Sequence, residues 1–248
     1  MFSRSHLAST CGCALALALL LPSGALAHKA KPPAKGGVKV FIRVEGAKRT
    51  LLAETAISVK SESVDPAGKP EDACTGVTAA AALQQATHGR WQGKYYSGLG
   101  YSVEAIDGEA FSFESPYYWS FWIDSKPATV GICSAKLHAG EHLLFFPQCS
   151  KEAATQCPQG LFDPPVLELR GPKRARVGQT ITLHVLSLEN AKGAPSAAKG
   201  ASIAGLGKAL TVGASGTVRV HLRRAGRFVV RVSAPGAIRD ELALTVVR

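Results

Sequence analysis

Alternating apolar and polar residues dominate the chain and predict β-strands. Residues 38–44 alternate Val, Val, Ile and Val with Lys, Phe and Arg, a pattern typical of a strand with one buried face. Further strand patterns occupy 50–60, 101–106 and 142–146. One segment has a different pattern. Residues 77–87 are Ala-rich, their apolar positions lie three apart, and Gly89 follows them. These features predict a short helix.

The most apolar strand pattern is also the most aromatic. Five of the six residues from Tyr117 to Trp122 are aromatic. Because strand side chains alternate between faces, Trp119 and Trp122 point to opposite sides of the sheet. Both faces therefore need cover, and the protein's own fold or a partner could provide it.

After residue 166 the strand patterns become short and are separated by Gly, Pro and Asn, which favours a β-sandwich. The segments 218–222 and 227–232 alternate apolar residues with mainly basic ones across an Arg-Ala-Gly turn. We expect the two segments to pair as a hairpin. Their outward side chains would then form a basic stripe, whose members are Arg219, Arg223, Arg227 and Arg231.

Charge divides the chain into two compositions. Residues 28–165 hold 14 Lys and Arg against 14 Asp and Glu, whereas residues 166–248 hold 14 against 4, a net charge of +10. We therefore predict two domains, residues 38–150 and 166–248, joined by a linker at 151–165. A charge excess of this size suggests that the second domain holds an anionic polymer.

The first 27 residues have the features of a secretory signal peptide. Arg4 precedes a short apolar core, and small residues at 25–27 form a cleavage site. A leader rich in Lys, Pro and Gly, residues 28–37, is expected to be disordered. Because no other apolar run is long enough to cross a bilayer, we expect a mature chain without a transmembrane segment. We expect it to be secreted, extracellular or associated with the cell envelope.

Four cysteines follow the predicted cleavage site: Cys74, Cys133, Cys149 and Cys157. An even number in an exported chain predicts two disulfides, for which three connectivities exist. We favour Cys74–Cys133 and Cys149–Cys157. A four-cysteine zinc site would need CxxC-like pairs, which the sequence lacks, so we predict no metal and no cofactor.

The order of strand, strand, helix and strands predicts an α+β fold of the β-grasp type, with a mixed sheet around one helix. The segments TLLAETAISV, CTGVTAAAALQQAT, YSVEAIDGEAF, YYWSFWIDSKPATVGIC and LHAGEHLLFFP together resemble the transcobalamin-like β-grasp family, over residues 38–149. This family includes a bacterial surface-protein domain of unknown function and the small C-terminal domain of cobalamin carriers. The segment 213–247 is similar to bacterial immunoglobulin-like surface domains, which implies an all-β sandwich.

The first resemblance also suggests a binding face. In the cobalamin carriers this small domain presents one face and its loops to the corrin, and a helical barrel that this chain lacks clamps the other side. Trp119 matches the family's Trp, and Val130, Gly131 and Ile132 match the loop after it. The candidate ligand-binding set is therefore Trp91, Tyr118, Trp119, Trp122, Val130, Gly131 and Ile132. The alternative is that helix 77–87 covers one aromatic face, and Trp91, Tyr95 and Tyr96 cover the other.

No nucleophile is paired with a base in the sequence, so we expect a protein without enzymatic activity. The main hypothesis is an exported bacterial binding or adhesion protein. Its aromatic head would bind a surface ligand, and its basic domain would hold an anionic envelope polymer such as teichoic acid, acidic polysaccharide or lipid headgroups. The alternative is a carrier of a small molecule such as a corrinoid. An undetected hydrolase or copper site is the third hypothesis, and nucleic acid is not an expected partner of an exported chain.

Overall fold

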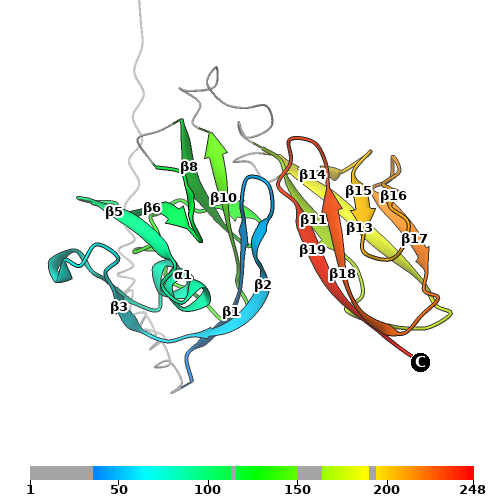
Figure 1. Cartoon of the computed structure of the whole chain (residues 1–248), viewed down its shortest axis with the longest axis horizontal. Helices are drawn as coiled ribbons and strands as arrows, with labels where there is room; N and C mark the ends of the chain where they lie inside the picture. The colour runs from blue at the N-terminus through cyan, green and yellow to red at the C-terminus, as the bar shows by residue number, and fades with distance from the viewer. Residues whose placement is uncertain (1–35, 113–115, 150–163, 190–193) are drawn as a thin grey trace, which may run out of the picture. The chain divides into compact units, whose positions relative to one another are not determined.

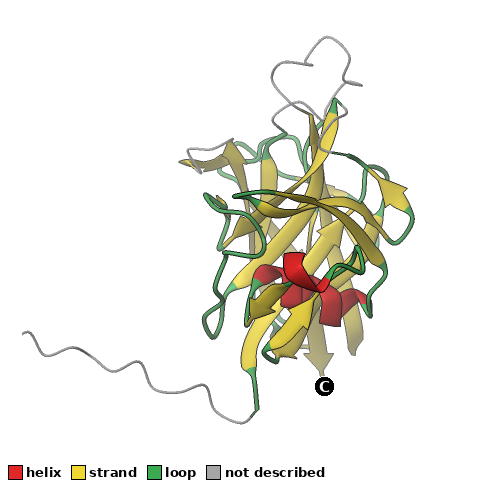
Figure 2. Cartoon of the chain, turned by 90° about the vertical axis from the view of Figure 1, so that its left-hand side faces the viewer, coloured by secondary structure: helices red, strands yellow, loops and turns green. Residues whose placement is uncertain are grey.

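The computed structural model describes residues 36–112, 116–149, 164–189 and 194–248, all within one compact unit. Figure 2 shows strands over most of this chain. The described residues contain nineteen strands and one α-helix of nine residues. None of their helices is long and apolar enough to cross a membrane. The predicted signal peptide and Cys157 lie outside the described residues, as do nearly all of the leader and of the linker.

The prediction of an α+β β-grasp fold for residues 38–150 is wrong, because this part of the chain is built almost entirely from strands. Ten strands precede residue 150, and the helical pattern gives only the two and a half turns of α1 (Ala79–Thr87). The aromatic and β-branched residues fill the strands, as their shape on a pleated surface favours. One short helix beside ten strands does not make this region an α+β fold.

The largest sheet of this region has the order β2-β1-β10-β8-β9 (Figure 1). Its strands are β1 (Val38–Glu45), β2 (Thr50–Val59), β8 (Tyr117–Ile123), β9 (Lys126–Pro127) and β10 (His142–Cys149). The pair β1 and β10 is parallel, and the other neighbours are antiparallel. The alternating residues of β1 behave as predicted, since Val40, Ile42 and Val44 are fully buried.

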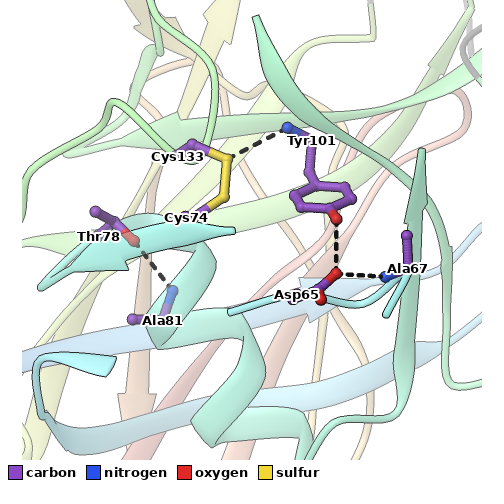
Figure 3. Close-up of a disulfide and its surroundings, with 7 residues drawn as sticks. All are labelled: Asp65, Ala67, Cys74, Thr78, Ala81, Tyr101 and Cys133. Carbon is purple, nitrogen blue, oxygen red and sulfur yellow. Dashed lines mark hydrogen bonds between the residues drawn. A yellow bond between two sulfur atoms is a disulfide. The ribbon is translucent and has the colours of Figure 1, made fainter. Parts of the chain in front are cut away.

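Helix α1 packs closely because its buried face is made of alanine. Ala79, Ala80, Ala81 and Ala82 are fully buried in the same core cluster as β1. The helix begins at Thr78, whose hydroxyl accepts a hydrogen bond of 3.3 Å from the main chain of Ala81 (Figure 3). Thr75, a second candidate for this capping role, lies in a short strand, β4 (Cys74–Gly76), which pairs with β3 (Glu62–Val64).

A smaller sheet completes the first region and contributes to the same core. It has the order β5-β6-β7, with β5 (Trp91–Tyr96), β6 (Gly100–Ile106) and β7 (Glu109–Ala110). Trp91 and Tyr101 are buried in the cluster that also contains Trp119. A one-turn 3-10 helix, η1 (Pro70–Asp72), precedes β4.

The residues after 164 form two sheets around a second apolar core, the arrangement of a β-sandwich. One sheet contains β11 (Val166–Arg170), β13 (Thr180–Glu189), β14 (Ala194–Ala197) and β17 (Thr217–His221). The other contains β12 (Arg174–Arg176), β15 (Ser202–Ala204), β16 (Leu210–Thr211), β18 (Gly226–Ser233) and β19 (Asp240–Val247). Side chains from both sheets meet in this core, including Leu183 from β13 and Val230 from β18.

A third apolar cluster covers part of the second face of the aromatic strand. Trp122 is 3% exposed and meets the ring of Phe146 edge-on at 5.8 Å between centroids. The other members are Leu144, Val166, Leu188 and Ile238. The chain itself therefore buries Trp122, with residues of β11, β13 and the segment before β19.

Four charged side chains lie beside this cluster. Arg43 pairs with Asp240, and Arg239 pairs with Glu45 at 3.0 Å. Arg43 and Glu45 are 6% and 1% exposed, so this network brings buried charges of both signs together. Burial raises the pKa of Asp240 to about 6, against the attraction of Arg43.

Candidate ligand-binding pocket

A cavity of about 350 Å³ lies between β6, β8 and the loop that follows β9. It is lined by Leu99, Tyr101, Ser102, Val103, Tyr118, Trp119, Ser120, Phe121, residues 127–132 and Gln148. Five of the seven residues proposed from the sequence lie in this lining: Tyr118, Trp119, Val130, Gly131 and Ile132. We call this cavity the Trp119 pocket.

The other two candidates, Trp91 and Trp122, lie outside the pocket lining. Trp91 is 5% exposed, and its indole N–H donates a hydrogen bond of 2.7 Å to the side-chain oxygen of Gln84. Trp122 belongs to the third apolar cluster. The indole N–H of Trp91 thus has an acceptor within the fold, and the ring of Trp122 packs in a cluster outside the pocket lining.

Trp119 has a buried donor that the fold does not use. Its side chain is 6% exposed, and its Nε1–H finds no hydrogen-bond acceptor among the residues that the structure describes. The ring meets Phe111 edge-on at 5.5 Å between centroids, so the indole is held by packing. Since a buried donor without an acceptor costs about 1–3 kcal/mol, an acceptor brought by a ligand would be favourable here.

Two exposed apolar side chains lie in the lining with this buried indole. Leu99 is 39% exposed and Val130 is 49% exposed. The loops that carry them touch closely, since a Cβ on Gly131 would lie 2.4 Å from the main-chain oxygen of Leu99. Only glycine allows this approach, so Gly131 sets the spacing between the two loops.

Helix α1 and a disulfide hold the loop after β9 in place. The main-chain oxygen of Ile132 accepts a hydrogen bond of 3.1 Å from Ala80, in the first turn of α1. The next residue, Cys133, is disulfide-bonded to Cys74, as predicted (Figure 3). The loop thus joins the start of the helix to β4, which rigidifies the pocket wall.

Tyr101 forms part of the wall from the β6 side. Its phenol oxygen donates a hydrogen bond of 2.9 Å to Asp65, and its main-chain N–H points to the sulfur of Cys133 at 3.3 Å (Figure 3). Burial, together with the Asp65 carboxylate, raises the pKa of Tyr101 to about 12. The hydroxyl therefore stays protonated and acts as a donor.

Sequence reasoning missed Leu99, Tyr101, Ser102 and Gln148, which all line the pocket. Leu99 and Tyr101 flank Gly100, whose φ of +84° and close approach to Cys133 require glycine. The glycine-rich stretch "SGLGY" was the available signal for this turn. It could not show which loop the turn would meet.

The second predicted disulfide has one partner outside the described residues. Cys149 is buried at the end of β10, whereas Cys157 is not described. The pairing Cys149–Cys157 therefore stays a prediction.

The structure does not bring the predicted basic patch together as a hairpin stripe. β17, which carries Arg219, pairs with β13, whereas β18, which carries Arg227 and Arg231, pairs with β15 and β19 in the other sheet. The expected hairpin pairing is therefore wrong, because a short turn in a sandwich can also carry the chain from one sheet to the other. Arg231 pairs with Glu241 at 3.2 Å, and Arg223 lies in the turn after β17.

No group of three or more His, Cys, Asp or Glu side chains within the described ranges could hold a metal ion. The histidines of the "HAGEH" segment contact separate carboxylates. His138 lies 3.0 Å from Glu141, and His142 lies 2.9 Å from Glu54.

Comparisons with known proteins identify no family for this chain. No family model matches, and no curated protein matches. A proposed metal-binding protein from Ruminococcus gnavus is 10% identical with a TM-score of 0.32, over 46% of this chain and 98% of that one.

Two further solved structures show equally distant likeness. The CARDB domain of a Pyrococcus furiosus protein, solved with di-metal ions, is 16% identical with a TM-score of 0.25, over 37% of this chain and 94% of that one. A polysaccharide lyase is 13% identical with a TM-score of 0.28, over 66% of this chain and 27% of that one. Likeness at these scores supports no functional assignment for this chain.

Proposed function

We propose that this chain is an exported, non-enzymatic bacterial binding protein that recognises its ligand in the Trp119 pocket. The basic sandwich of residues 166–248 would hold an anionic polymer of the cell envelope. In this proposal the first region selects a ligand and the second region keeps the protein at the envelope.

The observation that carries the proposal is the unused indole N–H of Trp119, a residue that lines a cavity. Ligand pockets in proteins are mostly apolar, with a few polar groups that orient the ligand. The Trp119 pocket has this composition, since its aromatic and aliphatic lining is interrupted by Ser102, Ser120 and Gln148. Trp119 would supply the hydrogen bond that fixes orientation.

The size of the cavity limits the ligand. At about 350 Å³ it lies near the lower end of the roughly 300–1,000 Å³ typical of ligand sites. It suits one ring-sized group that carries a hydrogen-bond acceptor, as part of a larger surface molecule. Exposed Leu99 and Val130 would contact the portion that stays outside.

A corrinoid carrier is the second candidate. The resemblance of Trp119 and residues 130–132 to the corrin-facing part of cobalamin carriers favours it. A whole corrinoid is larger than the cavity, so its macrocycle would rest on Leu99 and Val130 and only one side-chain amide would enter. That amide oxygen would accept the hydrogen bond from Trp119.

The test is a fluorescence titration of the full chain with cobinamide and, separately, with soluble peptidoglycan fragments. The informative variant is Trp119→Phe, which keeps an aromatic ring and removes the N–H. The matched control is Trp122→Phe, a change in the same strand at a residue outside the pocket. We expect Trp119→Phe to weaken binding about tenfold, the value of one buried hydrogen bond, and the control to leave it unchanged.

Either of two results would overturn the proposal. Equal weakening by both variants would mean that the packing of β8, and not the indole donor, determines binding. Binding that is unaffected by Trp119→Phe would place the ligand elsewhere.

A further inference from the structure

A hollow lined by basic side chains lies at one end of the sandwich, far in sequence from the Trp119 pocket. Its volume is about 470 Å³. The loop between β15 and β16 contributes Lys208, and the end of β17 with the turn after it contributes His221, Arg223 and Arg224. We call it the basic hollow.

The cations of the basic hollow are not neutralised by the fold. No acidic residue lines the hollow, and Lys208, Arg223 and Arg224 form no ion pair within the described ranges. Glu168 and Glu241, elsewhere in the sandwich, already have basic partners, Arg170 and Arg231 respectively. Like charges around one hollow repel each other, and a bound anion would relieve this repulsion.

Both walls of the basic hollow are fixed by packing. The guanidinium of Arg224 lies 5.4 Å from the centre of the Phe228 ring, a cation–π contact that orients it. On the other wall, Gly205 has a φ of +102°, and a Cβ there would lie 2.1 Å from the main-chain oxygen of Val229. The loop that carries Lys208 therefore begins in close contact with β18.

The lining also has an apolar part beside the charges. Leu222 is 4% exposed, and Leu206 and Phe228 are half-buried. A ligand that binds here would thus meet both cations and carbon surface. This combination suits an anionic group attached to a carbon skeleton better than a free ion.

We propose that Lys208, Arg223 and Arg224 bind a phosphate group of an anionic envelope polymer in the basic hollow. Guanidinium groups match phosphate oxygens in pairs, and a lysine ammonium adds a point charge. Three cations suit phosphate because it offers more oxygens than a carboxylate does. This inference rests on the proposed envelope role of residues 166–248, and it moves the site from the predicted stripe to the basic hollow.

The experiment uses the full chain and three probes, with isothermal titration at low salt. Poly(glycerol phosphate) and inorganic phosphate test the proposal, and polygalacturonate is the carboxylate comparison. The test variant is Lys208→Gln/Arg223→Gln/Arg224→Gln. The matched control is Arg174→Gln/Arg219→Gln/Arg227→Gln, which removes the same charge at exposed positions outside the basic hollow. All six side chains are exposed, so we expect both variants to keep the thermal unfolding midpoint of the parent.

We expect the test variant to raise the Kd for the polymer about 100-fold, because it removes several charge-assisted contacts, and the control to raise it less than about threefold. Binding by the parent should weaken steeply with salt, since the Debye length falls from about 10 Å at 0.1 M to about 3 Å at 1 M.

Five results would overturn the proposal or one part of it. If the two variants weaken polymer binding equally, net charge and not the basic hollow determines the affinity. If neither variant weakens it, the polymer binds elsewhere. Equally tight binding of polygalacturonate through the same residues would overturn the choice of phosphate over carboxylate. Inorganic phosphate bound through the basic hollow without any binding of the polymer would keep the site but overturn the envelope role. If the parent binds neither phosphate probe, both this inference and the proposed envelope role are wrong.

Discussion

The hydroxyl of Tyr101 donates a hydrogen bond of 2.9 Å to the carboxylate of Asp65, which lies 36 residues earlier in the chain (Figure 3). Tyr101 is 1% exposed and lines the Trp119 pocket, whereas Asp65 lies in the turn after β3. The contact therefore joins the pocket wall to a segment outside the pocket lining.

Tyr101→Phe tests this contact, because it removes the hydroxyl and keeps the ring. We expect a lower midpoint of thermal unfolding at pH 7 and weaker binding in the Trp119 pocket. Partial burial alone would raise the pKa of Asp65, but hydrogen bonds from Lys69 and Tyr101 lower it below its usual value. Asp65 therefore stabilises the fold above its ordinary pKa, and this contribution is lost as the pH falls through its lower folded value.

A titration at alkaline pH tests the same contact between Tyr101 and Asp65. The pKa of Tyr101 is raised to about 12. Its stabilising contribution is fully present below the ordinary tyrosine value of about 10 and is lost as the pH rises through about 12. Burial also raises the pKa of Tyr117. An absorbance titration should therefore show late-ionising tyrosine in the parent, and Tyr101→Phe should reduce that late signal by one tyrosine. An unchanged titration curve in the variant would contradict the assignment.

Removal of the Cys74–Cys133 disulfide should strongly destabilise the first region. The two residues are 59 apart in sequence, and closing a loop of this length stabilises by roughly 4 kcal/mol in the chain-entropy model. Cys74→Ala/Cys133→Ala should therefore unfold at lower denaturant concentration and lose pocket binding. Peptide mapping under non-reducing conditions would identify this pairing and also test the predicted Cys149–Cys157 bond. Free thiols at Cys74 and Cys133 in protein produced under oxidising conditions would contradict the prediction.

The buried pair of Arg43 and Asp240 should be costly to break on one side only. Asp240→Leu leaves buried Arg43 with only its 3.9 Å contact to Glu45, and we expect a loss of about 3 kcal/mol in the free energy of unfolding. The double variant Arg43→Met/Asp240→Leu removes both charges and leaves the pair of Glu45 and Arg239 in place. It should recover most of the loss, as measured by urea unfolding. A double variant less stable than the single one would show that each charge has separate essential contacts.

Individual helices and strands could be predicted from the sequence better than the pairing between strands. The alternation in residues 38–44 located β1 and its buried residues, and the Ala-rich pattern located α1 to within two residues at its start. Both signals are local, since they depend on burial of one face. Gly89 was also correctly placed after the helix, where its N–H bonds to Gln84 at 2.9 Å.

Strand pairing could not be predicted in the same way. The sequences of β17 and β18 fit a hairpin as well as they fit strands of two separate sheets, yet the two strands belong to different sheets. Alternation shows which face of a strand is buried, but not which strand lies beside it. The same limit hid the Trp119 pocket, because its walls come from β6, β8 and the loop after β9, and only the fold brings them together.

The most direct test of the account follows the three indole N–H signals in ¹H–¹⁵N spectra during titration with cobinamide and with soluble peptidoglycan fragments. Trp119 offers the buried indole without an acceptor, whereas Trp91 already donates to Gln84 and Trp122 lies in another cluster. We predict that one of the two probes moves the Trp119 signal downfield, as expected for a new hydrogen bond, and leaves the Trp91 and Trp122 signals in place. A Trp119 signal that stays unmoved with both probes, or binding that moves only the other two signals, would contradict the proposal that the Trp119 pocket is the recognition site.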